Sequence, residues 1–186
     1  MDRRFLPLAA AAAALAFASG CGDDDGGGTS VPSPSAAQRL TVSSSAFTEG
    51  GTIPRRYTCD GEDISPPLTV TGVPATTTTL AVLVQDPDAP HGTFTHWLLW
   101  NADPHQTRWP AGQPPKGATE GRNGFKKTGY GGPCPPKGSD PHHYVFSVYA
   151  ADRTLDLPST ASADDVNRAL TDHTLASGTL TGRYGR

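Results

Sequence analysis

The run Leu80 to Val84 (LAVLV) is apolar at every position, and it constrains the fold more than any other stretch of the chain. A strand with one face in water alternates apolar and polar residues, whereas a strand covered on both faces reads as a continuous apolar run. The sequence therefore predicts a strand at Thr79–Gln85 that lies inside a sheet covered on both faces.

Three further segments have the composition of strands: Leu40–Ala46, Phe94–Asn101 and His143–Ala150. Each is rich in β-branched and aromatic residues and is bounded by Gly, Pro or Asp. Helical pattern is confined to the C-terminal part, where Ser162 is expected to cap a helix over SADDVNRAL and a second short helix is expected at His173–Leu180. The sequence thus predicts a mainly β domain with a little helix.

The N-terminal residues 1–20 have the order of a secretion signal, with Arg3 and Arg4 before an apolar run. The small residues that follow lead into Cys21 and resemble the lipobox of bacterial lipoproteins, in which the cysteine is lipid-modified. The alternative is an ordinary cleaved signal with an incidental cysteine. The adjacent arginines leave both the general secretory and the twin-arginine export routes open.

Residues 21–38 (CGDDDGGGTSVPSPSAAQ) are rich in Gly, Ser, Pro and Asp and cannot bury enough apolar surface to fold. We therefore divide the chain into a signal at 1–20, a flexible tether at 21–38 and one domain at 39–186. The expected location is outside the cytoplasm, with lipid on Cys21 attaching the domain to the outer side of the cell membrane.

Charge and cysteine content limit the partners of the domain. From Arg39 onward there are 13 Lys or Arg and 14 Asp or Glu, with no basic stripe, so nucleic acid is an unexpected partner. Cys59 and Cys134 remain after Cys21 is assigned to lipid, and an exported domain favours one disulfide between them over two buried thiols. The absence of a C-x-x-C pattern disfavours a zinc ribbon or a thioredoxin-type site.

Polar residues gather at the ends of three predicted strands. Strand alternation places Asp86 at the end of the buried row in LAVLVQD, although Asp-Pro is also a common turn former. The same alternation places His96 on the face that carries Leu98 and Trp100, where a histidine is usually a core residue. On the last strand His142 and Tyr144 share one face, and His143 points the opposite way.

Together, Asp86, His96, His142 and Tyr144 suit an oxyanion. Imidazole and phenol groups can donate hydrogen bonds to it, and a carboxylate can orient an imidazole. A general-base role is conceivable, but the chain has no G-x-S-x-G, H-E-x-x-H or S-x-x-K motif. No cofactor and no metal site are expected, because His96, His142 and Asp86 include no compact ligand pair.

The order of these motifs resembles the phosphatidylethanolamine-binding protein (PEBP) family, in its bacterial Raf kinase inhibitor-like branch. The resemblance rests on DPDAP, the His96–Trp97 pair, the G-x-P-x-P-P-K-G loop and the following His-x-Tyr strand. It extends to YTCDGEDISPPL and HTLASGTLTGRYGR, and so to nearly all of 39–186. It implies a large antiparallel sheet packed with a smaller sheet, plus short peripheral and C-terminal helices.

The resemblance also implies a small pocket at one end of the sheet for phosphate, carboxylate or a phospholipid head group. Carried over by motif, its residues are Asp86, His96, Cys134, Pro135, His142 and Tyr144. Many relatives have His-Arg-Tyr where this chain has His142, His143 and Tyr144. Any ion pair that this arginine makes on the face of the strand opposite the pocket is therefore not predicted for this chain. The expected function is non-enzymatic anion binding outside the cytoplasm; the alternatives are a protease- or kinase-inhibitor-like interaction protein and, less favoured, a hydrolase.

Overall fold

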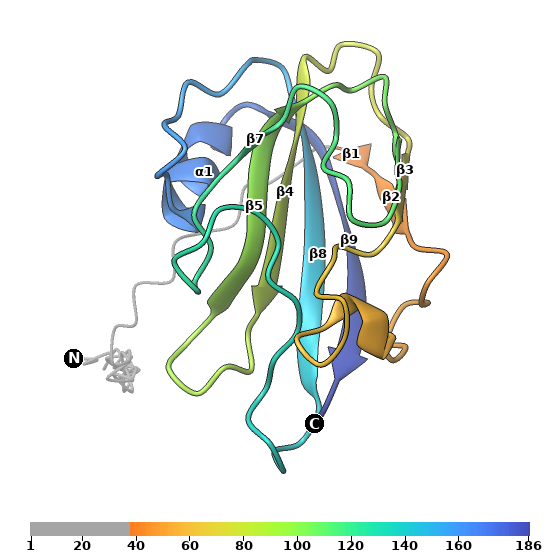
Figure 1. Cartoon of the computed structure of the whole chain (residues 1–186). Coiled ribbons are helices and arrows are strands. Elements are labelled where there is room, and N and C mark those ends of the chain that lie inside the picture. Colours follow the sequence, from red (N-terminus) through yellow and green to blue (C-terminus); the bar gives the residue numbers. More distant parts are fainter. Residues whose placement is uncertain (1–37) are drawn as a thin grey trace, which may run out of the picture. The chain divides into compact units, whose positions relative to one another are not determined.

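The computed structural model describes residues 38–186, which fold into two sheets and one α-helix (Figure 1). The predicted signal, Cys21 and the tether as far as residue 37 lie outside the described residues. Gln38, the last residue of the predicted tether, lies in strand β1 (Gln38–Arg39) and pairs with Ala176. Within the described part of the chain, no helix is both long and apolar enough to cross a membrane.

The large sheet has six strands in the order β1-β9-β8-β4-β5-β7. Their bounds are β4 Thr79–Asp86, β5 Phe94–Ala102, β7 Thr119–Glu120, β8 His142–Ala151 and β9 Thr174–Tyr184. All neighbours are antiparallel except β1 and β9, which run parallel. The predicted large sheet is therefore present, but it is mixed because the short β1 joins its edge in the parallel sense.

A smaller antiparallel sheet consists of β2 (Thr41–Ser43), β3 (Leu68–Thr71) and β6 (Arg108–Trp109). Its buried residues pack with Val82 and Val84 of β4 in one core cluster. Ala81 and Leu83 of the same strand pack in a second cluster with residues of the α-helix. The run LAVLV is thus covered on both faces, as its composition predicts. The predicted strand at Leu40–Ala46 is shorter than expected and contains only β2.

The helix α1 (Ala163–Leu170) begins where the sequence predicts. The Ser162 hydroxyl accepts from the backbone N–H of Asp165, whose carboxylate accepts from the Ser162 backbone in return, and Asp164 and Asp165 lie in the first turn. This reciprocal cap satisfies two N–H groups that a helix start otherwise leaves unpaired. A short 3-10 helix, η1 (Arg55–Tyr57), lies in the loop before β3.

The second helix predicted at His173–Leu180 is wrong, because this segment forms most of β9. The backbone of β9 pairs along the whole length of β8, and tertiary pairing outweighs a weak local helical preference. Gly178 fits this strand because a Cβ at its position would lie 2.3 Å from the carbonyl oxygen of Leu40. Only glycine permits so close a backbone approach.

Candidate functional site

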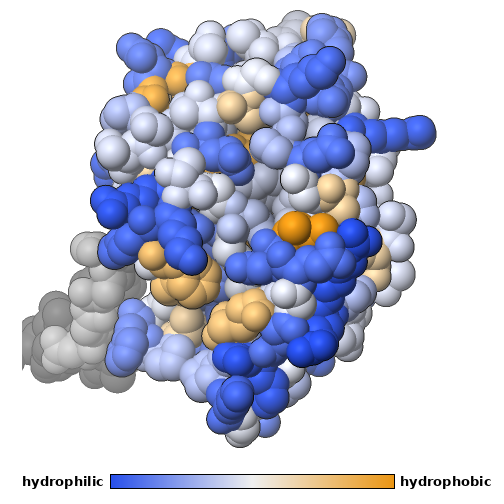
Figure 2. Space-filling view, in the orientation of Figure 1, coloured by the Kyte–Doolittle hydropathy of each residue, from blue (hydrophilic) through white to orange (hydrophobic). Residues whose placement is uncertain are grey.

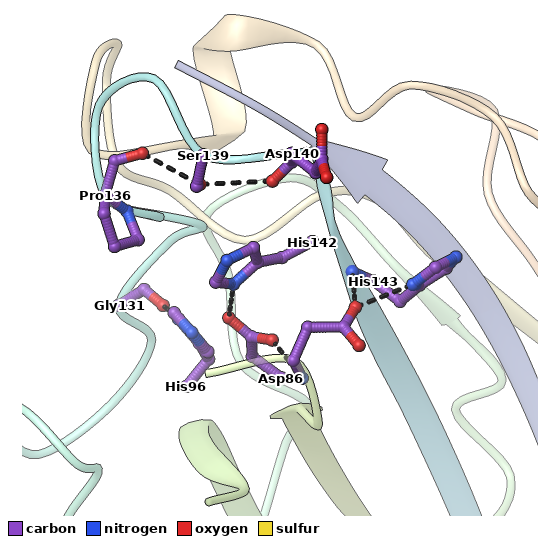
Figure 3. Close-up of polar contacts among 9 residues, drawn as sticks. Asp86, His96, Gly131, Pro136, Ser139, Asp140, His142 and His143 are labelled. Atoms are coloured by element: carbon purple, nitrogen blue, oxygen red, sulfur yellow. Dashed lines mark hydrogen bonds and ion pairs between the residues drawn. The ribbon is translucent and has the colours of Figure 1, made fainter. Parts of the chain in front are cut away.

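The three strands that carry the predicted polar residues lie side by side in the order β8-β4-β5. Because β4 is antiparallel to both neighbours, its last residue lies near the first residues of β5 and β8. Asp86 ends β4, His142 begins β8, and His96 is the third residue of β5. The three side chains therefore meet at one end of the large sheet (Figure 3).

A bulge in β5 places His96 on the pocket face. Val84 pairs with Trp97, but the next residue, Gln85, pairs with Thr95, so His96 is the extra residue of β5. The predicted alternation, which places His96 on the face of Leu98 and Trp100, is therefore wrong at this position. A bulge commonly turns one side chain toward a binding site, and here it leaves the His96 ring 5.1 Å from that of Tyr144.

A cavity of about 180 Å³ opens at this end of the sheet. It is lined by Asp86, Ala89, Pro90, Phe94, His96, Phe125, Cys134, Pro135, Pro136 and His142. Five of the six residues predicted for ligand contact are among them. Sequence reasoning missed Phe94 and Phe125, since the β5 bulge and the loop before β8 bring them to the cavity. Larger surface hollows exist elsewhere, but this one is where buried carboxylate and imidazole groups converge.

Asp86 and His142 form a buried pair in the cavity wall. Nδ1 of His142 lies 2.8 Å from Oδ2 of Asp86, and both residues are at least nine-tenths buried. A carboxylate accepts hydrogen bonds, so Nδ1 of His142 is the donor. The other carboxylate oxygen, Oδ1, accepts from the backbone N–H of Asp88 at 2.9 Å. Asp86 therefore both shapes the DPDAP turn and fixes the orientation of the His142 ring.

His96 is held by a backbone carbonyl instead of a carboxylate. Its Nδ1 lies 2.7 Å from the carbonyl oxygen of Gly131, which can only accept, so Nδ1 carries the hydrogen. Burial lowers the pKa of His96 below its ordinary value, and the hydrogen bond to Gly131 and the charge of Asp86 oppose this shift. The neutral ring is therefore favoured, and its Nε2 atom carries a lone pair.

Tyr144 lies beside His96, with the ring centroids 5.1 Å apart. Its side chain is fully buried, does not line the cavity, and its hydroxyl has no hydrogen-bond partner among residues 38–186. Burial, followed by the charge of Asp86, raises the pKa of Tyr144 above its ordinary range. The neutral hydroxyl is thus a buried donor without an acceptor, a group that usually binds a water or ligand atom. Direct contact of Tyr144 with a ligand stays a prediction.

His143 points away from the cavity, on the opposite side of β8 from His142 (Figure 3). Its Nδ1 and its backbone N–H both lie 2.7 Å from Oδ2 of Asp88. The chain thus forms a polar pair on the far face although the arginine of many relatives is absent. Asp86 and Asp88 are two residues apart. Each carboxylate accepts a hydrogen bond from a different histidine, and the two histidines lie on opposite faces of β8.

The Asp88 carboxylate gives a pH prediction. The hydrogen bond from the His143 backbone, and then that from its ring, lower the pKa of Asp88 in the folded state. A lowered pKa stabilises the fold above the unfolded value of about 4, and this contribution is lost as the pH falls through the folded value. In urea titrations from pH 5 to pH 2 we expect wild type to lose more stability than Asp88→Asn. The difference should stay below about 1 kcal/mol, because the pair is half exposed; equal losses would contradict this assignment.

The proline loop between Gly131 and Gly138 forms one cavity wall and is fastened to the segment 57–63. The disulfide expected between Cys59 and Cys134 is present, with Cα atoms 5.5 Å apart. The backbone N–H of Gly132 donates to Oδ1 of Asp63 at 2.7 Å. A Cβ on Gly132 would lie 2.6 Å from the carbonyl oxygen of Tyr57, so glycine is required for this approach. The loop is therefore positioned by covalent, polar and steric constraints together.

The C-terminal residue adds a cation near this wall. The Arg186 guanidinium lies 3.3 Å from Sγ of Cys134 and pairs with Oδ1 of Asp60 at 3.0 Å. Tyr184 donates to the other Asp60 oxygen at 2.7 Å. These contacts join the end of β9 to the cysteine that lines the cavity.

The rim of the cavity is aromatic. Phe125 is 41% exposed and is the one large hydrophobic side chain classed as exposed within 38–186. Its ring packs edge-on against Phe94, with the centroids 4.7 Å apart. The face of the molecule shown in Figure 2 is largely hydrophilic, with small separate apolar patches. The cavity thus combines an apolar rim with a polar floor. Among the described residues, no group of three or more His, Cys, Asp or Glu is placed to hold a metal ion.

The sequence that forms this site is similar to that of a known protein family. The model of the family described as phosphatidylethanolamine-binding protein matches residues 43–185. The chain belongs to this family. The residues that match the PEBP model include strands β3 to β9, α1 and every residue that lines the cavity. The match confirms the resemblance to the PEBP family and agrees with a binding role.

Individual PEBP relatives extend the comparison. UPF0098 protein PH1269 of Pyrococcus horikoshii is 45% identical over 150 residues, covering 77% of this chain and 75% of that protein. LppC of Mycobacterium tuberculosis, whose name marks it as a candidate lipoprotein, is 36% identical over 155 residues, covering 83% and 76%. The crystal structure of Escherichia coli YbcL, described as a new member of the mammalian PEBP family, has a TM-score of 0.75 and 34% identity, covering 80% of this chain and 99% of YbcL. These likenesses support the PEBP fold over most of the described domain.

Proposed function

We propose that this PEBP domain is a non-enzymatic binding protein for a small oxyanion, either phosphate, a carboxylate or the phosphate of a lipid head group. The observation that carries the proposal is the buried Asp86–His142 pair, which opens into a cavity of about 180 Å³. A buried carboxylate beside an imidazole compensates the charge of the protonated ring, so that Nε2 of His142 can donate to an anion. The cavity is smaller than the ~300–1,000 Å³ of a drug-sized site, which favours a head group over a large ligand.

The cavity wall also bears on enzymatic alternatives. Its cysteine, Cys134, is bonded to Cys59, so its sulfur is not a free thiolate that could attack a substrate. The Asp86–His142 pair resembles the base half of a nucleophilic triad, but none of the residues that line the cavity is a serine, threonine or lysine. A binding function needs only the polar groups that are present in the cavity wall, whereas nucleophilic catalysis needs a nucleophile as well.

The location of the protein is part of the same proposal. The signal at residues 1–20 and the lipobox-like sequence before Cys21 favour export and a lipid anchor on the outer side of the membrane. The similarity to LppC, named as a candidate lipoprotein, supports this location. The disulfide supports it as well, because disulfides persist in oxidising compartments. A Cys21→Ala protein that still partitions with membranes would contradict the anchor.

The binding proposal predicts that phosphate stabilises the protein through His142. At a phosphate concentration 100 times Kd, the free energy of unfolding rises by about 2.7 kcal/mol, and Tm rises by roughly 5–10 °C for a domain of this size. We expect His142→Ala to lose this shift because the anion loses its charged donor. Differential scanning fluorimetry measures the Tm of wild type and of His142→Ala in phosphate. Chloride at equal ionic strength is the salt control.

His143→Ala is the matched control, because His143 is the next residue and points to the opposite face. It should keep the phosphate-dependent rise in Tm. Equal rises in wild type and His142→Ala would contradict the site. Wild-type turnover on ester or phosphoester panels that His142→Ala abolishes would replace binding by catalysis.

A further inference from the structure

The hydrogens on the two cavity imidazoles determine what a ligand meets. Nδ1 of His96 lies 2.7 Å from the Gly131 carbonyl oxygen, and Nδ1 of His142 lies 2.8 Å from Oδ2 of Asp86. Both partners accept hydrogen bonds, so both Nδ1 atoms carry a hydrogen. Nε2 is therefore the ring nitrogen that each histidine has left for a ligand. A neutral ring offers a lone pair there, and a protonated ring offers an N–H donor.

The two rings have different surroundings. His142 contacts a carboxylate, which compensates the positive charge of the protonated ring, so its Nε2 can become a donor when an anion arrives. His96 has the rings of Phe94, Phe125 and Tyr144 edge-on at centroid distances of 5.0, 5.5 and 5.1 Å. Its fixed partner is a neutral carbonyl, which compensates a positive ring less well than a carboxylate does.

The titratable groups around His96 come from three elements. Asp86 lies at the end of β4, Asp63 lies in the segment before β3, and Tyr144 lies in β8. Both carboxylates favour the protonated His96 ring, but burial outweighs them and lowers its pKa. Tyr144 stays neutral because its own pKa is raised. The cavity thus presents one acceptor, at His96, and one potential charged donor, at His142.

We propose that His96 is a specificity-determining residue, whose unprotonated Nε2 requires a hydrogen-bond donor on the ligand, so that the cavity prefers phosphate monoesters to phosphodiesters. This inference rests on the proposed function. A monoester monoanion has one P–OH group, which donates to His96, and a charged oxygen, which accepts from His142. A diester has no hydrogen on its phosphate oxygens, so it leaves the buried His96 nitrogen facing another acceptor. An unsatisfied buried acceptor lowers affinity by about tenfold or more.

Two soluble probes test this preference by calorimetry on the purified protein: methyl phosphate, a monoester, and dimethyl phosphate, a diester. We expect methyl phosphate to bind about tenfold more tightly or better at pH 6. At pH 8 this ratio should fall by at least about tenfold, because the second pKa of a phosphate monoester is about 6 and the dianion has no hydrogen to donate. Because both probes are compared at the same pH, any effect of pH that they share cancels in the ratio.

The variant His96→Gln gives a second readout. Its amide can turn either a donor or an acceptor toward the ligand, so the ratio of the two affinities should approach one at both pH values. Wild type that binds both probes equally at pH 6, or with the same ratio at pH 6 and pH 8, overturns the role of His96 while the binding function stands. Binding of neither probe at either pH overturns the proposed function itself.

Vesicles distinguish the source of the monoester. Phosphatidic acid has a phosphate monoester head group, whereas phosphatidylglycerol has a diester. Recruitment of the Cys21→Ala protein, which lacks the proposed lipid anchor, to phosphatidic acid vesicles alone supports the proposal with a lipid as ligand. Binding of methyl phosphate without recruitment to either vesicle supports it with a soluble ester as ligand. Equal recruitment to both kinds of vesicle would contradict the monoester preference if methyl phosphate displaces the protein from both.

Discussion

Replacing Cys59 and Cys134 together by alanine should lower the free energy of unfolding by about 4 kcal/mol. The bond closes a loop with a sequence separation of 75 residues, and a cross-link over so long a loop removes much of the conformational freedom of the unfolded chain. A loss of this size is a large fraction of the ~5–15 kcal/mol that stabilises an ordinary domain. Urea titration followed by tryptophan fluorescence measures it, since Trp97 and Trp100 are buried.

The reduced wild-type protein is the control for this double variant. It should unfold at nearly the same urea concentration as the variant, while the oxidised protein should unfold at a clearly higher one. The variant should also bind phosphate more weakly, because Cys134 lines the cavity and the proline loop loses its covalent attachment. Equal urea midpoints for the oxidised protein and the variant would show that the loop is held by its hydrogen bonds alone.

Asp86→Asn should lower the affinity for methyl phosphate at pH 6 by about 100-fold, the effect of losing a hydrogen bond to a charged group. Asparagine keeps the size of the side chain and can still accept from His142, so the change removes mainly the charge. Without that charge the protonated His142 ring is uncompensated inside a buried wall, and the donor for the anion is lost. Calorimetry at constant ionic strength gives the ratio of affinities.

Asp88→Asn is the matched control, because its carboxylate lies two residues away and pairs with His143 outside the cavity. It should change the affinity by no more than about twofold to threefold, as expected for a screened, half-exposed charge. If Asp86→Asn binds more tightly than wild type, the carboxylate acts on the anion mainly by repulsion. If both variants weaken binding equally, the effect comes from the charge of the loop and not from the His142 pair.

Much of this architecture could be predicted from local sequence patterns. The continuous run in β4 indicates a strand covered on both faces, and the cap at Ser162 marks the start of α1. Strict alternation along β8 separates His142 from His143, and the structure places them on opposite faces. These features depend on a few neighbouring residues, so the sequence carries them directly.

Other features depend on partners that are distant in the sequence. The bulge at His96 arises from the register between β4 and β5, and alternation within β5 alone gives the wrong face. The segment after His173 is a strand because β8 offers a free edge, which local helical preference does not reflect. Phe125 reaches the cavity through the loop after β7, and no periodicity marks it.

The most direct test of the account is the ¹⁵N spectrum of the imidazole groups in histidine-labelled protein during a titration with methyl phosphate at pH 6. The chain has six histidines, and two of them, His96 and His142, line the cavity. The Nε2 signals of His96 and His142 should shift at saturation, with Nδ1 of both still protonated, while the other four histidines should stay unchanged. Unchanged Nε2 signals for both, or shifts confined to His143 and the remaining histidines, would contradict the proposed site.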